Sequence, residues 1–210
     1  DIGGIYKISL SNNDLGTNNT IFGKNAAKNI DAGSNNNVFI GEGVSDAAMD
    51  DAINNVGIGY EALSALTTGD NNTAVGFNAG LLITTGYANT LMGRLAGDSL
   101  TVGYDNVFLG TQAGRSTTHA SASVMIGQAT GEGNMTATAI GSVGVGAQAL
   151  NALTSGIGNV AVGYQALTDN TTGDYNTASG YNALNSNTGG SYNTATGGSA
   201  LKHNTTGGYN

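Results

Sequence analysis

Few side chains in this sequence have the types and spacing needed to carry out chemistry. Three acidic residues, Asp46, Asp50 and Asp51, lie close together and offer carboxylate oxygens of the kind that hard cations such as Ca²⁺ bind. Two histidines, His119 and His203, stand alone in polar segments. No nucleophile elbow, phosphate-binding loop or zinc signature occurs. We therefore expect no catalytic, cofactor-binding or metal-binding residues. We interpret the acidic cluster as a solvated turn and the histidines as surface residues.

Charge and composition restrict the classes of partner and of fold. The net charge is −8 and the six Lys and Arg residues are not clustered, so we expect no nucleic-acid partner. No apolar run reaches the length of a membrane-spanning segment, and we expect no membrane insertion. Ile, Leu, Val and Phe make up 42 of the 210 residues, near the level at which chains no longer bury enough apolar surface to fold. A regular structure must therefore replace a conventional large core.

A phrase of about seventeen residues recurs along almost the whole chain. It is clearest in NVAVGYQAL at 159–167 and NTASGYNAL at 176–184. We anchored each copy on the Gly that follows its apolar segment, which gives eleven copies spaced 17 to 19 residues apart. The anchors, which we name the corner glycines, are Gly23, Gly41, Gly59, Gly76, Gly93, Gly110, Gly127, Gly146, Gly163, Gly180 and Gly197.

Several columns of similar residues accompany these anchors. The third position before the anchor is always Thr or Val, and the position directly before it is apolar from Phe22 to Val162 and then becomes Ser179 and Thr196. The third position after the anchor is Ala in nine copies. The residue directly after the anchor is aromatic at Tyr60, Phe77, Tyr164 and Tyr181. The fourth position before the anchor is Ser123 or Ser142 in two copies and otherwise Asn, at Asn19, Asn37, Asn55, Asn72, Asn89, Asn106, Asn159, Asn176 and Asn193.

These columns predict an all-β fold, a parallel β-solenoid of about eleven seventeen-residue coils over residues 19–210. A helical repeat is disfavoured because each copy would place two or more Gly in a helix interior, at up to about 1 kcal/mol each. We expect each coil to contain a short strand, a glycine corner, a second short segment packed through Ala, and a polar turn. Stacked coils turn each column into a ladder, with Asn paired amide to amide and Val and Thr filling a narrow interior. Two candidate anchors, Gly141 and Gly146, predict a bulged loop in the copy between 127 and 146.

At NTAVGFNAG (72–80), NVAVGYQAL (159–167) and NTASGYNAL (176–184) the chain resembles the repetitive region of phage tail fibres and of tail-fibre-like bacterial surface proteins. It is also similar to the related head repeat of trimeric autotransporter adhesins, although that repeat is shorter than seventeen residues. The resemblance implies a homotrimeric parallel β-roll and a place outside the cell, on a cell surface or on a virion.

The repeat and the resemblance together predict a non-enzymatic structural or adhesive fibre module, a rod that spaces or presents a receptor-binding region. Three alternatives stay open at this point: a self-assembling extracellular filament that stacks end to end, a β-solenoid enzyme acting on polysaccharides, and an ice-binding protein that uses its TTG turns. The aromatic column after the anchor is a candidate binding surface for a cell-surface glycan or protein receptor. Packing between coils or between chains explains the same column equally well.

The partner that we expect first is the chain itself, as a homotrimer or an end-to-end filament. A thin roll buries little apolar area, so burial between chains must add to its stability. A lateral interface built from the Leu column, Leu63, Leu150, Leu167, Leu184 and Leu201, is one hypothesis. Residues 1–18, which include IYKISL, are expected to form a cap or junction segment, and the repeat pattern is expected to continue beyond the C-terminal end.

Overall fold

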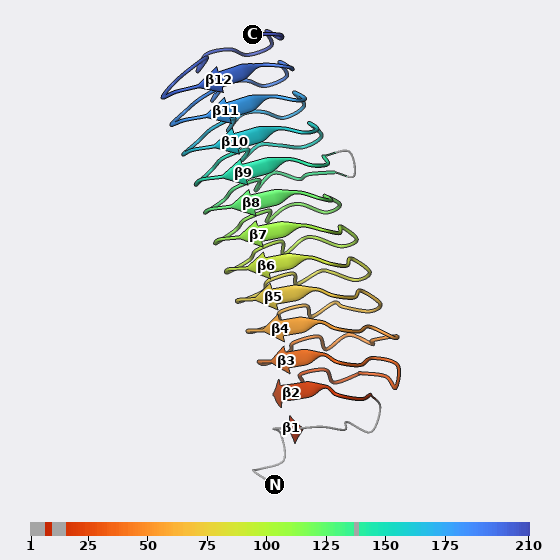
Figure 1. Ribbon diagram of the computed structural model, residues 1–210. Helices are drawn as coiled ribbons and strands as arrows, with labels where there is room; N and C mark the ends of the chain where they lie inside the picture. The colour runs from red at the N-terminus through yellow and green to blue at the C-terminus, as the bar shows by residue number, and fades with distance from the viewer. Residues whose placement is uncertain (1–6, 10–15, 137–138) are drawn as a thin grey trace.

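The computed structural model describes residues 7–9, 16–136 and 139–210, and this part of the chain is a single parallel β-solenoid without helices (Figure 1). Each coil contributes one short strand, and the strands lie side by side in chain order. The predicted fold class is confirmed as an all-β solenoid with coils of about seventeen residues. The strands are β1 Lys7–Ser9, β2 Thr20–Gly23, β3 Val38–Ile40, β4 Val56–Ile58, β5 Thr73–Val75, β6 Thr90–Met92, β7 Val107–Leu109, β8 Val124–Ile126, β9 Val143–Val145, β10 Val160–Val162, β11 Thr177–Ser179 and β12 Thr194–Thr196.

Strand β1 differs from the others because it pairs antiparallel with β2, placing Ile8 opposite Phe22. It therefore covers the edge of β2, which would otherwise present unpaired backbone groups. Residues 1–6 and 10–15 of the expected cap lie outside the described residues. The prediction of a cap over 1–18 stays a prediction.

From β2 to β12 the strands pair in parallel and in register, so equivalent residues of successive copies lie directly beside one another. Val107, for example, pairs with Val124, and Val124 pairs with Val143 across the longest copy. In that copy the corner is Gly146, which follows β9, and not Gly141. The expected bulged loop includes residues 137 and 138, which lie outside the described residues, while the strands on either side of it stay in register.

The second short segment that we expected in each coil, packed through Ala, is a turn in the described residues. Three positions per coil adopt left-handed backbone conformations, two and four residues after the corner glycine and five before it. In one coil these are Glu61, Leu63 and Asn71, with φ of 51°, 54° and 58°. Left-handed residues other than Gly or Asn are costly, so propensity does not reveal them. In the stack the backbone N–H of each of these three residues donates to a carbonyl of a neighbouring coil, as Glu61 N–H does to Glu42 at 2.9 Å.

The interior is filled by a different column from the one that we expected. Strand side chains alternate between two faces, and the middle residue of each strand points inward. Phe108 and Ala161 are fully buried, whereas the Thr or Val before the middle residue and the apolar residue after it face outward. The prediction that stacked Val and Thr fill the interior is therefore wrong, because the residue that follows the Val or Thr in each strand is the one that points inward. Period-two alternation does not itself say which face is inside.

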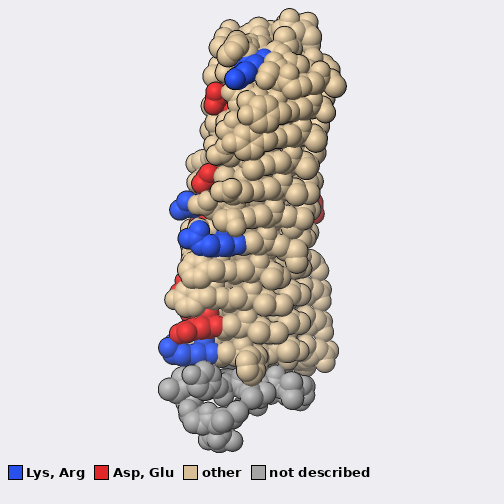
Figure 2. Space-filling view, turned by 90° about the vertical axis from the view of Figure 1, so that its left-hand side faces the viewer, with Lys and Arg blue, Asp and Glu red and all other residues tan. Residues whose placement is uncertain are grey.

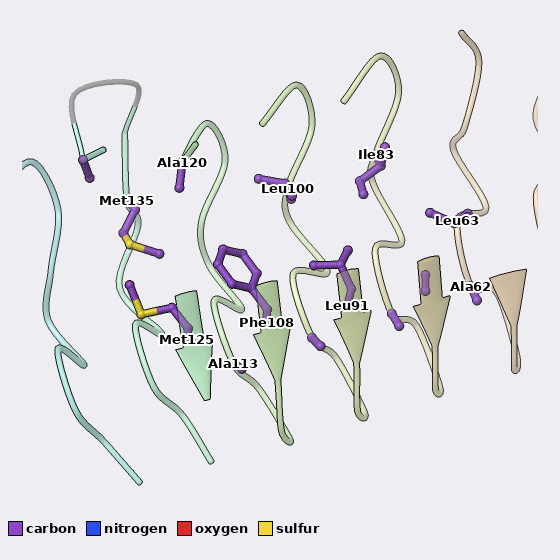
Figure 3. Packing of buried hydrophobic residues seen from close by; sticks show 14 of the residues in the cluster. Ala62, Leu63, Ile83, Leu91, Leu100, Phe108, Ala113, Ala120, Met125 and Met135 are labelled. Atoms are coloured by element: carbon purple, nitrogen blue, oxygen red, sulfur yellow. The ribbon is translucent and has the colours of Figure 1, made fainter. Parts of the chain in front are cut away.

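The Leu column is also an interior column and cannot form a lateral interface. Leu63, Leu150, Leu167 and Leu184 are fully buried, and only Leu201 in the last coil is partly exposed. These side chains fill the core together with the inward strand residues and the Ala column, as Figure 3 shows for part of the stack. The lateral contact proposed for this column is ruled out by its burial.

The two inward columns compensate each other in size. Where the inward strand residue is large, as at Phe108 and Met125, the position four after the corner is Gly114 or Gly131, and a Cβ on either glycine would collide with that side chain. Where the inward strand residue is small, the same position is Leu in most coils, as in Ala161 with Leu167, Ala178 with Leu184 and Gly144 with Leu150. Ala74 with Gly80 is an exception, and there the side chains of Leu63, Ile83 and Leu91 lie against Gly80. Close packing accounts for this, because a void and an overlap are both destabilising.

We expect Phe108→Ala to destabilise the protein by about 3–5 kcal/mol, because it removes a buried ring and leaves a cavity. Gly114→Leu alone should also destabilise, since the new side chain overlaps the ring. The double variant recreates the pairing of Ala161 with Leu167, so its loss of stability should be smaller than the sum of the two. Chemical denaturation of all four proteins measures this coupling. Additive losses would contradict the proposed compensation.

Candidate functional site

The Asn column forms a buried hydrogen-bonded ladder inside the coil, beside the strands. The amide Nδ2 of Asn89 donates to Oδ1 of Asn72 at 2.9 Å and to the carbonyl oxygen of Gly103 at 2.8 Å. Oδ1 of Asn89 in turn accepts from the backbone N–H and from Nδ2 of Asn106, at 3.2 and 2.9 Å. Asn89 thus bonds to backbone groups of the turn as well as to the amides of both neighbouring coils. The ladder links consecutive coils and fixes the turn before each strand.

The ladder is interrupted where Ser replaces Asn. The backbone N–H of Ser123 donates to Oδ1 of Asn106, but the Ser123 hydroxyl donates to the carbonyl of Ser121 within its own turn. Beyond Ser142 the ladder resumes at Asn159, whose Nδ2 donates to the carbonyl of Gly173 at 2.8 Å. These two copies flank the irregular coil, so the shorter side chain coincides with the place where the coil spacing changes.

A second Asn ladder, which the sequence analysis did not identify, begins in the C-terminal coils. Nδ2 of Asn187 donates to Oδ1 of Asn170 at 3.0 Å, and Nδ2 of Asn204 donates to Oδ1 of Asn187 at 2.9 Å. In most earlier coils the same column is apolar, with buried Leu66 and Leu100, but it also holds the buried Thr117 and the exposed Asn134. The recurrence of Asn seven residues after the corner glycine was the signal that could have revealed it.

The aromatic residues directly after the corner glycine stack on each other between coils. The rings of Tyr60 and Phe77 lie 5.3 Å apart and those of Tyr164 and Tyr181 lie 5.5 Å apart, nearly parallel in both pairs. The guanidinium of Arg94 lies 6.0 Å from the centre of the Phe77 ring. A sugar or receptor group that stacks on an aromatic needs a free ring face. Within each pair one face of each ring is already covered, so this geometry favours packing between coils.

Two further tyrosine stacks escaped the sequence analysis because they occupy other columns. Tyr87 and Tyr104 stack at 5.0 Å. Tyr175, Tyr192 and Tyr209 form a run of three, with centroids 5.3 and 5.0 Å apart. This run occupies the left-handed position five before a corner, where Tyr is not expected from backbone preference. Aromatic stacking along the axis is therefore a general device of this solenoid.

The acidic residues near residue 50 are arranged differently from the cluster that we expected. Asp50 and Asp51 lie with Asp31 of the preceding coil, their carboxylate oxygens within 4.8 Å of one another. Asp46 is separate from them, and its Oδ1 accepts a hydrogen bond from the Ser64 hydroxyl at 2.7 Å.

Asp31 serves as a hydrogen-bond acceptor for the turn around it. Its carboxylate accepts from the hydroxyl and the backbone N–H of Ser34 and from the backbone N–H of Gly33. Partial burial acts to raise the pKa of Asp31, but the hydrogen bonds outweigh it and hold that pKa below its usual range. The residue therefore has a structural use within the chain that needs no ligand.

The remaining polar side chains that could take part in chemistry are either exposed or hydrogen-bonded to the next coil. His119 and His203 are exposed, and Nδ1 of His119 lies 2.8 Å from the hydroxyl of Thr118. A column of Thr lies eight residues after the corner, and its hydroxyls donate to carbonyls of the next coil, as Thr84 does to Thr101 at 3.3 Å. Such hydroxyls already have a partner, which weakens the ice-binding alternative.

Comparison of the chain with protein families, with curated proteins and with solved structures finds no match. The described residues include no helix that could cross a membrane. The resemblance to tail-fibre repeats and adhesin heads stays a prediction.

Replacing Asn89 and Asn106 together by Ala should lower the melting temperature, because it removes the donors to the carbonyls of 103 and 120 and the acceptors for the next backbone amides. Each buried group left without a partner costs roughly 1–3 kcal/mol. Thermal unfolding followed by circular dichroism measures the change. The matched control is Asn71→Ala, an exposed position whose column already holds Ala88 and Ala122. Equal stability of the double variant and the control would show that the ladder is dispensable.

Proposed function

We propose that this chain is a non-enzymatic structural and adhesive module of a fibre, either a phage tail fibre or a cell-surface adhesin. It acts outside the cell as a rigid homotrimeric rod that spaces or presents a receptor-binding region. The observation that carries this proposal is the continuous stack of eleven parallel strands in register, in which, over the described residues, each strand contacts only the strands next to it (Figure 1).

The dimensions of the stack support the use as a spacer. Eleven strands joined by ten parallel pairings, at about 4.8 Å per strand, make a rod on the order of 50 Å long. A chain of this size folded as a sphere would be shorter, and adding a repeat would not extend it in one direction. In a rod, each added coil lengthens the molecule by a fixed step.

The use of the polar side chains supports a structural role. In an enzyme, several polar groups converge on a cleft where a substrate can reach them. Here the Asn, Thr and Tyr side chains described above bond or stack along the axis, each with its counterpart in the next coil. They resist sliding and twisting of one coil on another, which is the property that a rod needs.

The charge distribution is consistent with a spacer as well. Figure 2 shows that charged residues are sparse on the face drawn, most of which is uncharged. Lys24 and Glu42 form an ion pair at 2.8 Å between neighbouring coils, and Arg115 lies 3.7 Å from Glu132. These pairs again connect one coil to the next.

A rod of stacked coils should lengthen or shorten in whole steps. Residues 164–180 make one complete coil, and their removal joins Gly163 to Tyr181, which follows Gly180 in the same pattern. We expect this deletion to keep the fold and shorten the rod by about 5 Å, and duplication of 164–180 to lengthen it by the same step. The chain has no Cys, so labels at Thr68→Cys and Thr206→Cys report the length by energy transfer.

The control deletion removes only residues 164–172 and so shifts every later column out of register. It should unfold the C-terminal coils and abolish the defined label distance. If the whole-coil deletion also unfolds the protein, or leaves the distance unchanged, the modular rod is wrong. If the unaltered protein instead forms particles of many different lengths, the end-to-end filament alternative is favoured.

A further inference from the structure

The outer face of the parallel sheet carries two columns of side chains that the ladders and the core do not use. Each strand points its first and third residues outward, as Val107 and Leu109 do in β7 and Val143 and Val145 do in β9. We name the outward residues of β2 to β10 the outer strip. It runs along nine consecutive strands without a break in register.

The third-position column of the outer strip is entirely apolar, and the strip contains no charged residue. Its third-position members are Phe22, Ile40, Ile58, Val75, Met92, Leu109, Ile126, Val145 and Val162. Its first-position members are all Thr or Val. Several are well exposed: Phe22 is 52% accessible, Met92 43% and Val162 43%. Charged residues do occur in the column directly after the corner glycine, as at Lys24 and Glu42, so their absence from the strip is a property of this face.

The strip ends at a defined level. In β11 and β12 the outward residues are Thr177, Ser179, Thr194 and Thr196, all exposed. The backbone pairing continues unchanged through these strands. Strand geometry therefore does not demand apolar residues on this face, and their presence in β2 to β10 requires another cause.

We infer that the outer strip is the surface along which parallel copies of this same chain pack side by side. This inference rests on the proposed homotrimeric rod and assigns its interface, in place of the buried Leu column. Eighteen outward side chains at roughly 50 Å² each expose on the order of 900 Å² per copy, comparable to the 800 Å² or so that each partner buries in a stable complex. Exposed apolar patches of this size mark interaction sites.

A second copy fits this surface better than a partner of another kind. The strip repeats along the axis at the strand spacing of about 4.8 Å, and only a surface with the same repeat meets it row by row. Each copy carries a net charge of −8, so copies repel unless they meet through a face without charge. The outer strip is such a face.

The boundary at β11 favours a parallel direction for copies that overlap along their full length. In a parallel arrangement each strand lies at the level of its own counterpart, so apolar rows meet apolar rows and Thr or Ser rows meet their like. A fully overlapping antiparallel arrangement would place Thr196 of one copy near Phe22 of the other, burying an apolar ring against hydroxyls. The parallel arrangement avoids that mismatch.

The first test changes the charge of the strip. The triple variant Ile58→Lys, Leu109→Lys and Val145→Lys places three ammonium groups on the outer face and leaves the core untouched. Light scattering should give a trimer of the 20.8 kDa chain for the unaltered protein and a folded monomer for the variant. The control carries Thr68→Lys, Thr85→Lys and Thr172→Lys. These substitutions add the same charge at exposed positions of the TTG turns and should leave the trimer intact.

The second test uses introduced cysteines and does not depend on the fold tolerating Lys. Single variants Met92→Cys and Val162→Cys are treated with a short thiol-specific crosslinker, with Thr172→Cys as the control. Parallel packing predicts crosslinked chains for both strip positions and none for the control. Crosslinking at Met92→Cys without Val162→Cys would overturn the parallel direction, since β6 is the middle strand of the strip.

The outcomes separate this inference from the proposed function. A folded monomer for the unaltered chain, a trimer that survives the Lys substitutions, or crosslinking only at the control position would overturn the interface. None of these outcomes bears on the proposed rod, which the deletion and duplication of residues 164–180 test separately. Loss of the length steps together with intact crosslinking at the strip would reject the rod and keep the interface.

Discussion

The structure depends on one constraint, which is that every coil must place equivalent residues directly beside those of the next. Parallel backbone pairing sets this register, and buried amides reinforce it, since the Asn89 side chain can satisfy backbone groups only if Asn72 and Asn106 lie at the same position in their coils. An amide ladder inside a narrow roll has no water to replace a missing partner, so a slip of one residue would orphan several buried groups at once. Repetition in the sequence is the consequence of this requirement.

The same constraint explains how costly backbone conformations persist. A Leu at φ 51°, as at Leu150, is unfavourable alone. In the stack its backbone N–H donates to the carbonyl of Ala166 at 3.0 Å, and its side chain fills the space opposite Gly144. The surrounding coils therefore determine the conformation of the turn. In return, the left-handed residues bend the chain sharply enough to close a coil with a single three-residue strand.

The repeat length, the corner glycines and the in-register stacking of columns could be predicted from sequence because each leaves a periodic trace. Which side of the strand faces inward could not, because the columns of Phe108 and Leu109 are both apolar and only the closure of the coil decides between them. The second Asn ladder and the run of tyrosines from Tyr175 were missed because they occupy only part of a column. Size compensation between Phe108 and Gly114 involves positions six residues apart, and the turn conformation that brings them together is not visible in residue preferences.

A coil with one strand has a further consequence for the surface. Its inward residue is chosen by the core, but its two outward residues are free of that demand, as the exposed Thr194 and Thr196 of β12 show. This face is free to be polar and nevertheless holds Ile, Val, Leu or Met at successive levels, which fits the proposed packing between copies. The core of a thin roll is limited by its cross-section. In the proposed assembly, a second apolar layer outside the sheet, shared between copies, would add burial without widening the coil.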